Sequence, residues 1–245
     1  MSIATTPSLR RALLLGALSL SGTAMAWGDA VNGSGRVATE NRTAAAFDAV
    51  AVAGAIDVEL RQAGQEALTV TADDNVLPLI ETVVEGDRTL HIRFRRGVSV
   101  STRTPVKVSV DVVRLAALSA AGSGQLRIAG LKTPALKLSI AGSGDARFDD
   151  LKTDAFEARI AGSGSVVARG SAGQAKLTIS GSGDIDLLPL AADDVKVSIA
   201  GSGDAKVTAN KSLQVSIAGS GDVVWAGNAT DVKSKVAGSG RVTRR

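Results

Sequence analysis

The sequence predicts an all-β protein, a parallel β-helix (β-solenoid) in which coils of about 20 residues stack on one another. Three observations lead to this prediction. The tripeptide Gly-Ser-Gly recurs at nearly constant spacing and begins at residues 122, 142, 162, 181, 201, 219 and 238. The segments before it alternate apolar and polar residues, as in LKLSIAGSG (136–144), which is the pattern of a half-buried strand. When the repeats are aligned on the tripeptide, residues of one kind fall into columns.

These columns indicate that each coil lies in register on the one before it. Neighbouring strands lie about 4.8 Å apart, so each side chain packs on its counterpart in the next coil. The clearest column precedes the tripeptide by two residues and consists of Ile140, Ile160, Ile179, Ile199, Ile217 and Val236. We expect these side chains to fill a shared interior. Because parallel crossover connections are overwhelmingly right-handed, we expect a right-handed coil.

The tripeptide itself is interpreted as a corner of the coil. If the chain stays extended through it, Gly142 and Gly144 point inward and Ser143 points outward. Glycine has no Cβ, so the wall can bend sharply there or approach the opposite wall closely. The serines of successive coils then form an outward polar ladder.

The first 26 residues have the features of a signal peptide. Arg10 and Arg11 are followed by a mostly apolar run (12–22) and by Ala24-Met25-Ala26, the small-residue pattern of a cleavage site. The apolar run is too short for the roughly 20 residues of a membrane helix. We therefore expect cleavage after Ala26, export to the periplasm, the cell surface or the medium, and a single mature domain over 27–245.

Residues 31–115 are expected to form irregular N-terminal coils. FDAVAVAGAIDVEL (47–60) resembles a coil whose corner is reduced to Gly54. ALTVTADDN (67–75) is typical of a strand that runs into a turn, and its Asn75 could cap a short helical turn over 76–81.

Two further strand patterns lead into the regular array. TVVEGDRTLHIRF (82–94) predicts a hairpin around Gly86-Asp87, and PVKVSVDVV (105–113) alternates again. An eighth Gly-Ser-Gly lies near the mature start, at 33–35. Residues 116–245 then provide about seven regular coils.

The motifs GSGRV (33–37), FDAVAVAGAIDVEL, DDNVLPLIETVVEGDRTLHI (73–92) and the serial AGSGD coils occur in this order. In this respect the chain resembles the bacterial family "putative auto-transporter adhesin, head GIN domain" over nearly all of the mature chain. The resemblance implies a β-helical secreted or cell-envelope protein. It implies no catalytic residue.

Composition excludes several classes of function. The net charge is only +4 and no basic block stands out, which argues against a nucleic-acid partner. Four Phe, two Trp and no Tyr leave few rings to stack on neutral sugars. Since cysteine is absent from an exported chain, a long hydrogen-bonded ladder is the expected source of stability.

An aspartate column follows the corners at Asp145, Asp184, Asp204 and Asp222. Asp184, Asp204 and Asp222 lie on consecutive coils and could hold Ca²⁺ together with serine oxygens. The alternative is a solvated acidic column, because the Coulomb repulsion between neighbouring carboxylates in water is only about 0.9 kcal/mol at this spacing. We favour the alternative and expect no metal or cofactor.

A lysine column is expected on the outside, before the corners. It comprises Lys137, Lys176, Lys196 and Lys233, and Glu157 and Gln214 interrupt it. It could contact anionic glycans or lipopolysaccharide. Alternatively, it could serve solubility and prevent lateral sheet pairing, for which lysine is well suited.

No enzymatic signature is present. His91 is the only histidine, and GSGD lacks both the third glycine and the following helix of a dinucleotide loop. Asp184, Asp186 and Asp204 with Lys206 are the only cluster that resembles the carboxylates of β-helical polysaccharide enzymes, and fold analogy alone supports that interpretation.

The sequence therefore favours an exported, non-enzymatic cell-envelope or surface protein, adhesin-like, which presents a polar solenoid surface to a protein or glycan. The alternatives are a periplasmic structural or sensing module and a polysaccharide-acting enzyme. The last coil ends at GSGRVTRR (238–245) without an obvious cap. Either Trp225 and the basic tail cover this end, or chains associate end to end.

Overall fold

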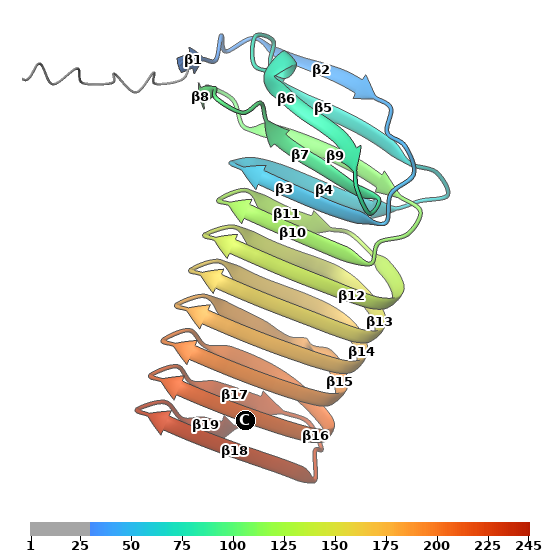
Figure 1. Cartoon of the computed structure of the whole chain (residues 1–245). Helices are drawn as coiled ribbons and strands as arrows, with labels where there is room; N and C mark the ends of the chain where they lie inside the picture. Colours follow the sequence, from blue (N-terminus) through green and yellow to red (C-terminus); the bar gives the residue numbers. More distant parts are fainter. Residues whose placement is uncertain (1–29) are drawn as a thin grey trace, which may run out of the picture.

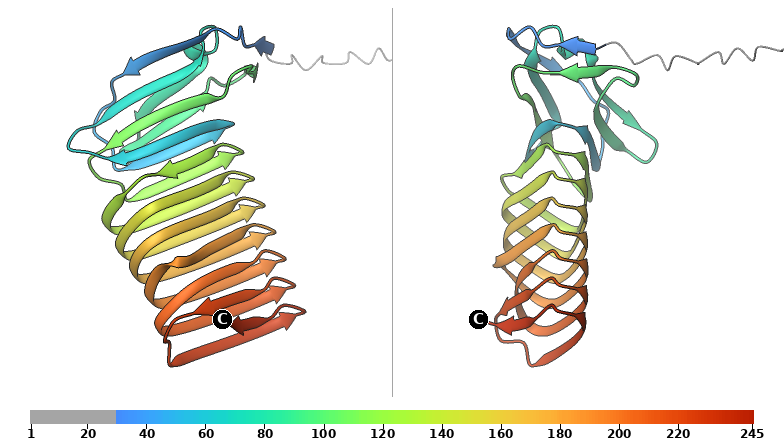
Figure 2. Two further views of the ribbon diagram at one scale, coloured as in Figure 1. Left: turned by 180° about the vertical axis from the view of Figure 1, so that it is seen from behind. Right: turned by 90° about the vertical axis from the view of Figure 1, so that its left-hand side faces the viewer.

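The computed structural model describes residues 30–245, so the predicted signal peptide lies outside the described residues. The chain forms a β-solenoid, as predicted, and Figures 1 and 2 show its coils stacked in a narrow, elongated array. The N-terminal strands lie at one end of this array and the C-terminus lies at the other (Figure 1). Within the described residues, no helix has the length and hydropathy needed to cross a membrane.

The regular array begins with β10 (Ala117–Gly122). Each coil contains a strand before a Gly-Ser-Gly corner and a strand after it, and in the middle coils the far bend is also extended. The strands are β10 (Ala117–Gly122), β11 (Gln125–Ile128), β12 (Leu131–Gly142), β13 (Asp145–Gly162), β14 (Ser165–Gly181), β15 (Asp184–Gly201), β16 (Ala205–Gly219), β17 (Val223–Ala226), β18 (Asp231–Gly238) and β19 (Val242–Arg244). All pairings among them are parallel, and about six turns separate the first corner from the last.

The register confirms the predicted columns. Ile179 is paired with Ile160 in the preceding coil and with Ile199 in the following one. These isoleucines are at most 3% exposed. Parallel, in-register stacking therefore fills the interior with like side chains. That the coil is right-handed stays a prediction.

The corners require glycine mainly because coils stack closely along the solenoid axis. Gly201 has φ +134°, and a Cβ built there would overlap the carbonyl oxygen of Gly181 in the preceding coil. The second glycine, Gly203, meets the carbonyl of Gly183 in the same way. The serine between them is exposed, and its N–H donates to Gly181 O at 2.9 Å. The corner prediction is confirmed, but the close approach is to the neighbouring coil and not to the opposite wall.

The N-terminal region combines strands that stack in parallel with antiparallel strands. Its elements are β1 (Ala30–Asn32), β2 (Val37–Arg42), β3 (Ala49–Gly54), β4 (Ile56–Gln62), β5 (Ala67–Asp73), the 3-10 turn η1 (Leu77–Leu79), β6 (Ile80–Glu85), β7 (Thr89–Phe94), β8 (Ser99–Ser101) and β9 (Val106–Val112). β3 and β4 form the predicted coil, because Gly54 is paired with Gly122 of the next corner. β5 is antiparallel to both β2 and β9, and β6–β7 is the predicted hairpin.

The prediction that Asn75 caps the helical turn is wrong. The N-cap residue of η1 is Val76, and no side chain caps the turn. The Asn75 side chain instead accepts a hydrogen bond from Ser34 N at 2.9 Å and donates to Asn32 O at 2.8 Å. Its partners are more than 40 positions away, so no local pattern could reveal them.

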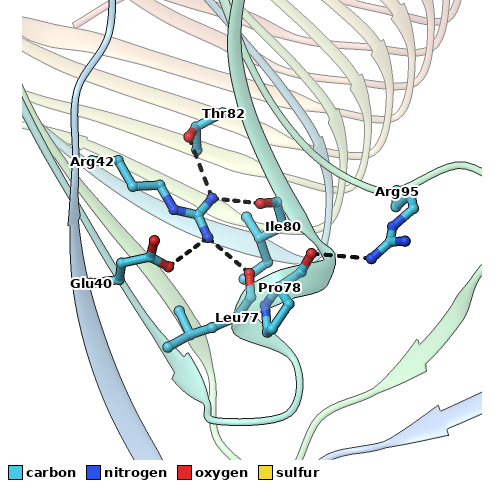
Figure 3. Close-up of polar contacts among 7 residues, drawn as sticks. All are labelled: Glu40, Arg42, Leu77, Pro78, Ile80, Thr82 and Arg95. Carbon is cyan, nitrogen blue, oxygen red and sulfur yellow. Dashed lines mark hydrogen bonds and ion pairs between the residues drawn. The ribbon is translucent and has the colours of Figure 1, made fainter.

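Arg42 anchors η1 from the neighbouring strand β2. Its guanidinium donates to the carbonyl oxygens of Leu77 and Ile80 and pairs with Glu40 at 3.0 Å (Figure 3). The Arg42 side chain is only 14% exposed. The carbonyls at the end of the short turn therefore find a charged donor, which fixes the path of the chain into β6.

The eighth Gly-Ser-Gly is not a corner. Gly33 lies against the buried carboxylate of Asp73, where a Cβ would overlap Asp73 Oδ2. Asp73 also accepts hydrogen bonds from Thr104 Oγ1 at 2.6 Å and Arg103 N at 3.0 Å. These hydrogen bonds, that of Thr104 foremost, lower the pKa of Asp73. This tripeptide therefore encloses a buried anion.

Candidate functional site

The candidate site is the outer face of the strands that precede the corners, which we call the leading wall. Three outward columns form it. The column next to the corner consists of Ala121, Ala141, Ala161, Ser180, Ala200, Ala218 and Ala237, and all seven residues are exposed. The next column consists of Ser119, Ser139, Arg159, Thr178, Ser198, Ser216 and Lys235. The side chains of these two columns are small except for Arg159 and Lys235, so most of this part of the wall is flat.

The third column contains the predicted lysines. Cα pairing places Lys137, Glu157, Lys176, Lys196, Gln214 and Lys233 on successive coils, in that order. Glu157 pairs with Arg159 at 2.7 Å and with Lys176 at 3.0 Å. The hydrogen bonds from these two residues, that of Arg159 foremost, lower the pKa of Glu157. One carboxylate is thus shared by two cations.

Two shallow hollows lie on the C-terminal half of the leading wall. One, of about 340 Å³, is lined by side chains that include Lys196, Gln214, Ser216, Lys233 and Lys235. No carboxylate lines it. The adjoining hollow, of about 290 Å³, shares Lys196 and Gln214 and adds Lys176 and Asp194. The sequence pattern did not single out Lys235. This residue occupies the position in its coil that Ser216 occupies in the preceding coil.

The trailing wall, which follows the corners, carries the aspartate column. Asp184 Oδ1 accepts a hydrogen bond from Asp204 N at 3.0 Å, and Asp204 Oδ1 accepts one from Asp222 N at 2.7 Å. Asp57, Asp145 and Asp222 bind the next coil in the same way. Each carboxylate thus accepts a hydrogen bond from a backbone N–H beside the corner of the next coil.

This arrangement accounts for the acidic column without a cation. Within residues 30–245, no group of three or more His, Cys, Asp or Glu side chains is arranged to hold a metal ion. The calcium alternative for Asp184, Asp204 and Asp222 can be tested by experiment, as described below.

Among the residues considered for catalysis, strand pairing places Asp186 beside Lys206 of the next coil, and Asp204 N donates to Asp184 Oδ1. His91 lies on β7, and its charged neighbour is Glu85 at 4.0 Å. Asp186 accepts a hydrogen bond from Leu188 N at 3.1 Å, and Asp184 and Asp204 bind backbone amides as described above. The three carboxylates of the cluster proposed by analogy with polysaccharide enzymes therefore all accept hydrogen bonds from backbone amides.

The C-terminal end of the solenoid is half covered. Arg244 lies over the Trp225 ring at 4.8 Å and donates to Gly227 O, so the tail covers the β17–β19 side. On the other side β18 is exposed along its whole length, and Val232 and Val236 are each 40% exposed. The end-to-end association of chains stays a prediction, which the exposed Lys233 and Lys235 on this edge strand oppose.

Comparisons with known proteins agree with this architecture. The family model described as "Putative auto-transporter adhesin, head GIN domain" matches residues 46–229. The chain is similar to a solved structure described as a putative adhesin from Bacteroides fragilis, with 24% identity and a TM-score of 0.81 over 88% of this chain and all of that one. None of the curated proteins compared with the chain matches it.

Two further solved structures are similar in fold. One, from Parabacteroides merdae, is described as a putative adhesin and shows 27% identity and a TM-score of 0.70. The other, from Parabacteroides distasonis, is described as a putative lipid binding protein and shows 24% identity and a TM-score of 0.76. Each match covers 89% of this chain and all of the other chain.

Proposed function

Because the chain belongs to the family described as "Putative auto-transporter adhesin, head GIN domain", we propose that it is an exported, non-enzymatic protein of the cell envelope or surface. Its leading wall presents to a partner a flat surface of small residues beside a column of polar ones. The observation that carries this proposal is the exposed row of small residues next to the corners, which continues over seven coils. A rigid wall of this kind offers a large contact area without loops that must become ordered on binding.

Binding to cell envelopes tests the role of the wall. In the variant A161Q/A200Q, two exposed alanines of the leading wall become longer, uncharged residues. We expect binding of the purified mature chain to envelope fractions to fall, because side chains that protrude from a flat surface separate it from its partner. The matched control is S171Q/A191Q, in which exposed residues of the far bend are changed. Equal binding by the two variants would contradict the proposal.

Location is tested on intact cells. An adhesin-like role requires that added protease degrade the chain without lysis of the cells. Protection until the outer envelope is opened would favour the periplasmic structural or sensing alternative. Release of reducing ends from pectin or alginate by the purified chain would favour the enzymatic alternative.

A further inference from the structure

We propose that the leading wall binds a linear acidic polysaccharide through a lysine patch formed by Lys176, Lys196, Lys233 and Lys235. This inference rests on the proposed function, since it names the partner chemistry of the same wall. Its starting point is the hollow of about 340 Å³ that Lys196, Lys233 and Lys235 line and that no carboxylate lines. Lys176 lines the adjoining hollow, together with Asp194.

The charge of the patch is poorly compensated. Of the described carboxylates, none lies within 4.0 Å of the ammonium groups of Lys196 and Lys235, whereas Lys233 pairs with Asp231 at 3.0 Å. Both partners of that pair are more than half exposed, so the pair is weak and an incoming anion can replace Asp231. Lys176 shares Glu157 with Arg159, which leaves one positive charge in excess there.

The patch runs along the solenoid axis. Lys176 and Lys196 lie on adjacent coils, and Lys233 lies two coils beyond Lys196. At about 4.8 Å per coil, the row spans about 14 Å. Gln214 and Ser216 lie between the lysines and donate or accept hydrogen bonds without adding charge. A linear polyanion that lies along the axis reaches all four ammonium groups at once, whereas a single small anion reaches one or two.

The surroundings of the patch favour an acidic glycan over a lipid surface. The neighbouring outward columns carry Ala and Ser together with Arg159, Thr178 and Lys235, so these columns offer no large apolar side chain to insert among acyl chains. Val232 and Val236 belong to the interior columns, where they pair with Leu213 and Ile217, and lie on the edge strand β18. Without aromatic rings to stack on neutral sugars, recognition relies on the carboxylate groups of the polymer.

The test measures binding of the mature chain to polygalacturonate, with dextran of the same length as the neutral probe. We expect polygalacturonate to bind, dextran not to bind, and the affinity to fall as salt shortens the Debye length from about 10 Å at 0.1 M to 3 Å at 1 M. The variant K196Q/K233Q/K235Q should bind at least about tenfold more weakly, because three exposed charge contacts are lost. All three lysines are exposed, so melting should be unchanged.

The control variant K132Q/K152Q/K211Q removes three exposed lysines from the far bend and has the same net charge. We expect it to bind within about twofold of wild type. Equal losses in the two variants would overturn the inference, because binding would follow net charge and not the patch. Binding to phosphatidylglycerol vesicles but not to polygalacturonate would overturn it in favour of lipid headgroups.

The proposed function can survive the failure of this inference. If polygalacturonate does not bind while A161Q/A200Q still reduces envelope binding, the acidic-glycan partner is wrong and the role of the leading wall stands. If the alanine variant has no effect on envelope binding but the lysine variant loses polygalacturonate, the patch is a glycan site and the proposed use of the whole wall is wrong.

Discussion

The N-terminal region (30–112) and the regular array (117–244) reach the same sheet architecture by different means. In the array each strand is parallel to its counterpart, and the same contact is repeated in every coil. In the N-terminal region β5 runs antiparallel between β2 and β9, and single polar contacts fix the chain. The array therefore repeats equivalent apolar contacts, whereas the N-terminal region adds to its apolar core polar contacts that have no equivalent elsewhere.

The Gly-Ser-Gly tripeptide shows this difference most clearly. In the array its glycines allow the carbonyl of the preceding coil to approach, while in the N-terminal region Gly33 makes room for the carboxylate of Asp73. The same three residues thus serve backbone stacking in one place and anion burial in the other. Sequence similarity alone does not distinguish the two uses, because the atom that each glycine meets comes from a distant segment.

The largest expected effect comes from a charge placed in the isoleucine column. Ile179 is fully buried between Ile160 and Ile199, so the substitution Ile179→Asp buries a carboxylate without a partner. We expect it to lower the free energy of unfolding by more than about 3 kcal/mol. Chemical denaturation measures this loss, and Ala200→Asp, on the exposed face, is the control and should cost less than about 0.5 kcal/mol. A small loss for Ile179→Asp would mean that the column faces solvent.

A somewhat smaller effect is expected at the corner. Gly201→Val adds a side chain where the carbonyl of Gly181 lies and where φ is +134°. We expect a loss of about 2–3 kcal/mol from overlap and backbone strain together. Gly64→Val is the control, because a Cβ at Gly64 meets no atom within 4 Å. If the two variants melted alike, close stacking of the corners would be wrong.

The sequence was sufficient to predict the array but not the N-terminal sheet. Seven repeats align with one another, so the columns around Ile179 and the corners at residues such as Gly201 follow from the alignment alone. β2 and β5 have no internal counterpart, and their antiparallel pairing joins residues about 30 positions apart. The outward position of the wall lysines follows from the alternation of apolar and polar residues along each strand. The hollow beside them depends on the conformations of the side chains, which the alternation does not determine.

The N-terminal region should differ from the array in its dependence on pH. Hydrogen bonds from Thr104 and Arg103 lower the pKa of Asp73 in the folded chain. A lowered folded-state pKa stabilises the protein above the ordinary Asp pKa of about 3.9, and this contribution is lost as the pH falls through the folded-state value. Asp73→Asn should therefore be less stable than wild type at pH 7, and the difference should shrink below about pH 4.

Denaturation of both proteins at pH 7 and pH 3 measures this change. Asp204→Asn serves as the comparison in the array, where the carboxylate is exposed. A difference between wild type and Asp73→Asn that stays constant with pH would show that Asp73 acts only through packing against Gly33.

The smallest expected effect separates the two interpretations of the aspartate column. Asp204 Oδ1 accepts a hydrogen bond from Asp222 N, so Asp204→Ala should lose about 0.5–1.5 kcal/mol, the usual net value of one hydrogen bond. Asp204→Asn keeps an acceptor oxygen and should lose less. A calcium site would behave differently, because both Asp204→Asn and Asp204→Ala remove the carboxylate charge and both would weaken Ca²⁺ binding.

Melting with and without millimolar Ca²⁺ distinguishes the two interpretations. We expect Ca²⁺ to cause no shift in the melting temperature of wild type or of either variant. A Ca²⁺-dependent rise in wild type that both variants lack would show that the aspartate column is a metal site.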